Sequence, residues 1–65
     1  MKLKVNGEMK DTDASTLYDV IVSTGLDPSR VAAELNGRIV PRADFKDTAV
    51  KENDSLEIVH FVGGG

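Results

Sequence analysis

The chain has 65 residues and a formal net charge of −3, with acidic and basic residues mixed along its length. A domain of this size buries only about 60% of the surface that its unfolded chain exposes, which excludes a deep catalytic cleft, and the lack of a Lys/Arg cluster excludes a nucleic-acid surface. Because there is no cysteine, disulfides, thiolate metal sites and a thiol nucleophile of its own are excluded as well.

Residues 1–12 have the pattern of a β-hairpin. Apolar side chains alternate with lysines over residues 1–5, as in a strand with one buried face. Asn6 and Gly7 follow, a pair typical of the type I′ turn because both positions need a positive φ. Residues 8–12 are short and polar, so we expect them to return as a strand at the edge of the sheet.

The next segment carries the signals of one amphipathic helix. Asp13 or Ser15 can cap its first turn through a side-chain oxygen. The buried stripe has the spacing i, i+3, i+4 and i+7 and consists of Leu17, Val20, Ile21 and Thr24. Gly25 supplies a left-handed C-terminal residue and Pro28 prevents continuation, so we expect a helix of roughly three turns that packs on one sheet face.

A second hairpin follows the helix. Residues 31–35 alternate between apolar and polar or small side chains, as a strand does. Asn36-Gly37 forms another tight turn, and residues 38–40 return as a short strand. Pro41 ends this strand because proline lacks the backbone donor that a sheet ladder needs.

The residues after Pro41 predict a central strand and a buried aromatic side chain that fills the core as a plug. A helical turn at residues 44–45 places Phe45 in the core, and a turn at 53–54 leads into residues 55–62, the most apolar strand. We therefore expect an α+β roll, a mixed sheet of about five strands with one helix on one face, in a single domain over residues 1–62.

No apolar run has membrane-spanning length and the N-terminus lacks an apolar leader, so we expect a cytoplasmic protein without membrane contact.

Three glycines, Gly63, Gly64 and Gly65, follow the last predicted strand and are expected to form a flexible tail. A glycine segment has no side chains and can thread a narrow channel, and three residues reach roughly 10 Å. The Gly65 carboxylate becomes reactive only after activation, for example by adenylation, and without cysteine any sulfur must come from another protein. The alternative is a frayed end without function.

The residues that lead into the tail are candidates for contact with a partner. Val59, Phe61 and Val62 are expected to stay partly exposed and to form a docking patch beside the tail, although Phe61 can instead fold back onto the sheet edge. His60 is the only histidine, so it lacks partners for a metal site and receives no catalytic role. Arg42 can hold the tail or a partner carboxylate, or it can be an ordinary surface arginine.

The whole chain resembles the ThiS family of bacterial sulfur carriers. The resemblance is carried by Val5-Asn6-Gly7, by residues 34–42 (ELNGRIVPR) and by residues 54–65 (DSLEIVHFVGGG). The block that ends in His60-Phe61-Val62-Gly63-Gly64-Gly65 is the most specific of the three. One departure is the third glycine, since the family pattern needs only a terminal pair.

The resemblance implies a ubiquitin-like β-grasp fold and a carrier that is not itself an enzyme. It implies that a ThiF-like enzyme adenylates Gly65 with ATP and magnesium, and that sulfur from a cysteine desulfurase persulfide converts the carboxyl group to a thiocarboxylate, a 1-thioglycine. Thiazole synthase, ThiG, would then take the sulfur into the thiazole ring of thiamin. The carrier itself would bind no cofactor.

Two other functions stay open at this point. A MoaD-like carrier uses the same chemistry to deliver sulfur to molybdopterin, and related carriers serve other sulfur-containing metabolites. A β-grasp interaction module belongs to a different class, and in such a module the glycines would be incidental.

Overall fold

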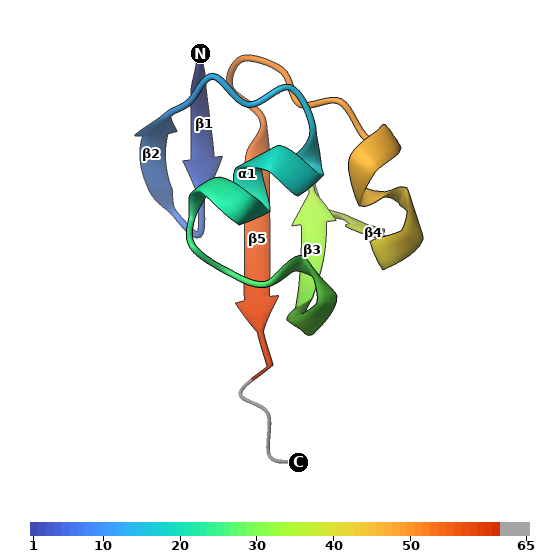
Figure 1. The fold of residues 1–65 in the computed structure, drawn as a ribbon. Helices are drawn as coiled ribbons and strands as arrows, with labels where there is room; N and C mark the ends of the chain where they lie inside the picture. The colour runs from blue at the N-terminus through green and yellow to red at the C-terminus, as the bar shows by residue number, and fades with distance from the viewer. Residues whose placement is uncertain (62–65) are drawn as a thin grey trace.

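The computed structural model describes residues 1–61 of the chain. In chain order its elements are β1 (Lys2–Val5), β2 (Glu8–Asp11), α1 (Leu17–Ser23), η1 (Pro28–Arg30), β3 (Val31–Leu35), β4 (Arg38–Val40), η2 (Arg42–Asp47) and β5 (Ser55–His60), where η marks a 3-10 helix (Figure 1). The strands form one sheet in the order β2-β1-β5-β3-β4. β1 and β5 are parallel, and the other neighbours are antiparallel. The predicted mixed sheet with the last strand at its centre is confirmed.

Both hairpins turn through an Asn-Gly pair, as predicted. Asn6 and Gly7 have φ values of 50° and 84°, and Asn36 and Gly37 have φ values of 52° and 85°. Left-handed conformations at both central positions define the type I′ turn, whose twist matches that of the flanking strands. The turns therefore set the register in which Val5 faces Glu8 and Leu35 faces Arg38.

The start and length of α1 differ from the prediction. The N-cap is Thr16, whose Oγ1 accepts a hydrogen bond from Asp19 N–H at 3.2 Å, and not Asp13 or Ser15. Thr16 is held extended by a bridge to Ala49, so the chain cannot become helical earlier. The helix has seven residues, which is about two turns and not three.

The end of α1 follows the predicted signal. Thr24 is the C-cap and is exposed, so it does not belong to the buried stripe, which consists of Leu17, Val20 and Ile21. Gly25 has a φ of 85°, the left-handed conformation expected after a helix. Pro28 then begins η1.

The core lies between the sheet and α1, which crosses in front of the central strands (Figure 1). Phe45 in η2 is 1% exposed, so the predicted plug is confirmed, although its helical segment is longer than one turn. The other buried apolar side chains come from both hairpins, α1 and β5: Leu3, Val5, Leu17, Val20, Ile21, Val31, Ala33, Val50, Leu56 and Ile58. A core of this kind leaves the opposite face of the sheet available for other contacts.

Candidate functional site

The candidate site is the C-terminal end of β5, from which the chain continues toward the glycines. β5 lies between β1 and β3, and its residue His60 is paired with Val31. One residue further on, Phe61 N–H donates a hydrogen bond to Arg30 O at 2.8 Å. The backbone is thus anchored to the sheet through Phe61. The predicted carrier residues Gly63, Gly64 and Gly65, and the predicted patch residue Val62, lie outside the described residues.

The sheet face that points away from α1 exposes apolar side chains near the end of β5, beside the charged pair Glu34 and Glu57. Val59 is directly opposite Ala32 in the register, and the neighbouring residues Ile58 and Ala33 point into the core. Val59 is 58% exposed and Phe61 is 50% exposed. Both predicted patch residues are therefore accessible, and their contact with a partner remains a prediction.

Ile39 in β4 belongs to the same face and was missed by the sequence reasoning. It is paired with Glu34, whose side chain alternates with the core residue Ala33, and it is 78% exposed. The signal was present in the sequence, because Ile39 has outward parity in a strand of three residues. We call Ala32, Ile39 and Val59 the open sheet face.

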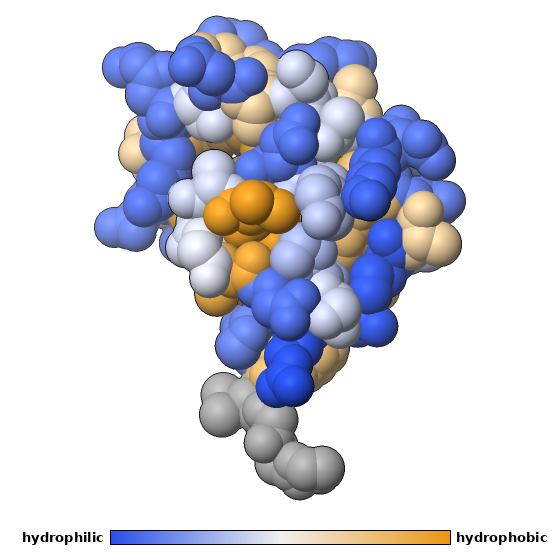
Figure 2. Space-filling view, viewed as in Figure 1, coloured by the Kyte–Doolittle hydropathy of each residue, from blue (hydrophilic) through white to orange (hydrophobic). Residues whose placement is uncertain are grey.

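The opposite side of the molecule has a different character. Figure 2 shows the helix side as largely hydrophilic, with one apolar cluster in front, over α1. Val22 in α1 is 48% exposed. This helix-side residue supplies a control for any experiment on the open sheet face.

Positively charged side chains flank the end of β5. Arg42 Nη2 donates a hydrogen bond to Val31 O at 3.4 Å, so Arg42 lies beside the residue that pairs with His60. Arg30 Nε lies 3.8 Å from Asp27 Oδ2. Hydrogen bonds from the Ser29 side chain and backbone, with smaller contributions from the charges of Arg30 and His60, lower the pKa of Asp27. Arg30, Arg42 and His60 therefore lie near the end of β5, and Asp27 is the acidic group paired with Arg30.

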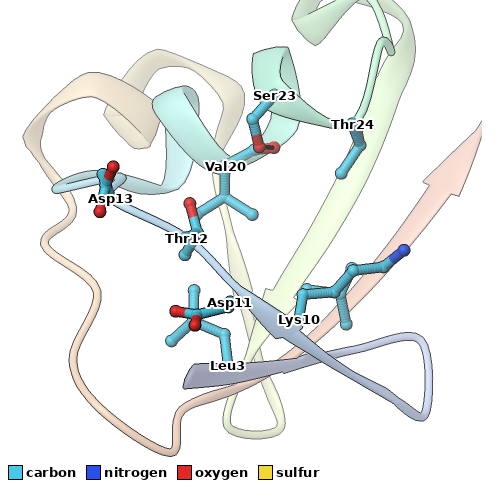
Figure 3. A pocket seen from close by; sticks show the side chains of 9 residues that line it. Leu3, Lys10, Asp11, Thr12, Asp13, Val20, Ser23 and Thr24 are labelled. Atoms are coloured by element: carbon cyan, nitrogen blue, oxygen red, sulfur yellow. Dashed lines mark hydrogen bonds between the residues drawn. The ribbon is translucent and has the colours of Figure 1, made fainter. Parts of the chain in front are cut away.

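A groove lies between α1 and the β1–β2 hairpin (Figure 3). Its floor is apolar, with Leu3 and Val20, and its rim carries Lys10, Asp11 and Asp13. Asp11 Oδ1 accepts from the N-terminal ammonium group of Met1 at 3.3 Å. Residues 1–61 contain no cluster of His, Cys, Asp or Glu that could hold a metal ion.

The described part of the chain has no helix long and apolar enough to cross a membrane. His60 is exposed, and its lack of a catalytic role stays a prediction. What the geometry offers is a compact body, an anchored central strand and an accessible apolar face beside its end.

A five-stranded mixed sheet with one main helix on one face is the ubiquitin-like β-grasp fold, as predicted. The crystal structure of the thiamine biosynthesis protein ThiS from Geobacter metallireducens matches the whole chain over its own whole length, with a TM-score of 0.82 and 32% sequence identity. The ThiS family model matches residues 3–65. The chain belongs to the ThiS family.

The relatives include a sulfur carrier protein and thiazole synthases. The sulfur carrier protein ThiS of Bacillus subtilis is 36% identical over 67 residues, which cover 97% of this chain and 98% of that protein. The thiazole synthase of Paramagnetospirillum magneticum is 42% identical over 66 residues, which cover 100% of this chain and 20% of that protein. The chain thus spans about a fifth of the length of the thiazole synthase that it matches.

Proposed function

We propose that this chain carries sulfur for the formation of the thiazole ring in thiamin biosynthesis, as a thiocarboxylate at Gly65. The observation that carries the proposal is the family match, which runs from residue 3 through residue 65 and so includes all three glycines. The likeness to the Bacillus subtilis sulfur carrier over nearly its full length supports the same function. In this function the chain is a co-substrate of other proteins and not a catalyst.

The chemistry takes place on the Gly65 carboxyl group. A carboxylate oxygen attacks the α-phosphorus of ATP in a ThiF-like partner that uses magnesium, which gives an acyl-adenylate and pyrophosphate. The terminal sulfur of a cysteine desulfurase-derived persulfide then attacks the acyl carbon and AMP leaves, forming an acyl disulfide. A second thiol cleaves the sulfur–sulfur bond, which releases the thiocarboxylate and a disulfide. Both thiols must belong to partners, because this chain has no cysteine.

The body of the protein contributes a rigid platform and a docking surface. β5 is the central strand, paired with β1 and β3, and Phe61 just after it is bonded to Arg30 O, so the chain leaves the sheet from an anchored position. Val59 and Phe61 expose apolar surface beside that position, and the buried core of a protein–protein contact is apolar. Glycines add no side-chain bulk where the chain enters a partner's active site.

Thiazole synthase is the proposed acceptor of the sulfur. Support comes from the proteins named thiazole synthase that contain a segment similar to this entire chain. Complementation of a thiazole auxotroph separates this pathway from a MoaD-like function. Growth that is restored only where molybdenum-cofactor synthesis is limiting would contradict the thiamin assignment.

The direct test is intact mass spectrometry. The purified chain is incubated with ATP, magnesium, a ThiF-type activator and a persulfide source, and we expect the mass change of one oxygen replaced by sulfur, located at Gly65 by fragmentation. A variant that lacks Gly64 and Gly65 is the control and should stay folded and uncharged. Absence of the mass change in the full chain, with an activator that charges its own carrier, would refute the proposal.

A further inference from the structure

Two asparagine side chains bond the backbone of β5, Asn36 at its first residue and Asn6 at Ile58, two residues before its end. Asn6 Oδ1 accepts a hydrogen bond from Ile58 N–H at 2.7 Å, and Asn6 Nδ2 donates to Ile58 O at 3.1 Å. At the start of the strand, Asn36 Oδ1 accepts from Ser55 N–H at 2.9 Å, and Asn36 Nδ2 donates to Asp54 Oδ1 at 3.0 Å. Each asparagine is the first residue of a tight turn, so the same residue type performs the same task twice.

The Asn6 side chain continues a ladder that the backbone has to leave. Lys4 N–H donates to Asp54 O at 2.9 Å, and Asn6 N–H donates to Leu56 O at 2.8 Å. A parallel ladder is evenly spaced, so the next donor on β5 is Ile58 N–H, and its acceptor in a longer β1 would be the Asn6 carbonyl. With a φ of 50°, Asn6 instead begins the turn. Its side-chain oxygen accepts the bond in place of the backbone.

Within residues 1–61, the two hydrogen bonds between Asn6 and Ile58 are the last ones that β5 makes on its β1 side. Beyond Ile58, the described backbone contacts lie on the other side, where His60 is paired with Val31 and Phe61 N–H donates to Arg30 O. Without the Asn6 bonds, β5 beyond Leu56 would be hydrogen-bonded to β3 alone and could change its direction relative to β1. With them, Ile58 is bonded on both sides, and this restricts the direction in which the following residues continue.

We propose that Asn6 is a positioning residue for the carrier segment, because it fixes Ile58 and thereby the direction in which the chain leaves the sheet. This inference rests on the proposed function, in which that direction decides how the glycines enter a partner. Asn36 also accepts from a β5 amide, that of Ser55 at the far end of the strand, but its Nδ2 donates to the Asp54 side chain and not to β5, so it contributes to the fold without bearing on the exit of the strand. The two residues form a matched pair within one molecule.

The experiment compares Asn6→Gly with Asn36→Gly. Glycine keeps the positive φ without strain and removes both side-chain bonds in each case. Amide hydrogen exchange is followed at Ile58 and Phe61 and is referred to the amide of Leu17, a buried residue of α1 that donates to Thr48 O at 2.8 Å and does not contact either asparagine through a hydrogen bond. Charging kinetics with the activator are measured at a temperature at which circular dichroism shows both variants to be fully folded.

We expect Asn6→Gly to accelerate amide exchange at Phe61, relative to Leu17, by about tenfold. This factor corresponds to a loss of about 1.4 kcal/mol in the free energy of local opening. The kcat for charging should fall by a similar factor. Asn36→Gly should leave both quantities within about twofold of the parent, since its lost bonds lie at the far end of the strand. Asn6→Asp keeps the acceptor for Ile58 N–H and should recover part of the loss.

Equal effects of the two glycine variants, or unchanged exchange at Phe61 in Asn6→Gly, would overturn the positioning role. The exchange experiment needs no partner protein. If the parent chain itself cannot be charged, the proposed function fails, and the comparison of Phe61 exchange between the two variants still decides whether Asn6 fixes the end of β5.

Discussion

Truncation of Phe45 tests the account of the core most directly. Phe45 lies in η2 and is 1% exposed, packed in the cluster that joins α1 to the sheet. Replacement of a buried phenylalanine by alanine costs about 3–5 kcal/mol, because the lost contacts leave a cavity. The chain has 65 residues, and at about 0.05–0.15 kcal/mol per residue its total stability is roughly 3–10 kcal/mol. The variant Phe45→Ala should therefore lose between a third and all of its stability.

Urea denaturation followed by circular dichroism measures this loss. With an m-value of about 1 kcal/mol/M, the midpoint should fall by about 3 M or more, or the folded baseline should vanish. Phe45→Leu conserves most of the volume and should lose less than about 1.5 kcal/mol. Ile39→Ala is the control, since Ile39 is 78% exposed, and its stability should change by no more than about 0.5 kcal/mol. A loss below about 1 kcal/mol in Phe45→Ala would refute the role of Phe45 as the plug of the core.

Three further predictions concern the docking patch, the helix cap and one acidic group. Val59→Asp should raise the KM of the activating enzyme for this chain about tenfold in steady-state charging assays, because a charge enters an apolar contact. Val22→Asp on the helix side is the control and should leave this KM unchanged. Equal effects of the two substitutions would contradict docking through the open sheet face. Thr16→Ala should lose about 1 kcal/mol in thermal or urea unfolding, and Ser15→Ala should change little; the reverse order would contradict the observed cap. Hydrogen bonds from Ser29 lower the pKa of Asp27 in the folded state below the ordinary value of an aspartate. The Asp27 carboxylate therefore stabilises the fold above that ordinary value, and this contribution disappears as the pH falls through the folded-state pKa. Asp27→Asn should therefore flatten the decline in the unfolding midpoint between neutral pH and the acid range, and an unchanged decline would show that the hydrogen bonds of Asp27 do not contribute.

The strands and turns of this protein could be predicted from the sequence because their causes are local. Alternation of apolar and polar residues needs only the period of a strand, and it correctly assigned β1 and β3. The Asn-Gly pairs predicted both hairpins, because few other residues accept two successive positive φ angles. The fold class followed from the order of these elements.

The helix start could not be read correctly from the sequence. Four residues before the buried stripe, from Asp13 through Thr16, include three that can cap a helix, and local propensity does not choose among them. The choice is made by Thr48 and Ala49: Leu17 N–H donates to Thr48 O at 2.8 Å, and Thr16 bridges Ala49. These partners lie more than thirty positions further along the chain.

The sequence by itself determined the alternation, the turns and the glycine segment, since each is written in neighbouring residues. Only the tertiary structure decided that Ile39 joins Val59 on the open sheet face, because this depends on the strand order. It also decided that the Asn6 side chain bonds Ile58, which lies 52 positions away. A turn residue can hold a distant strand only after the sheet has brought the two together, and no local pattern records that contact.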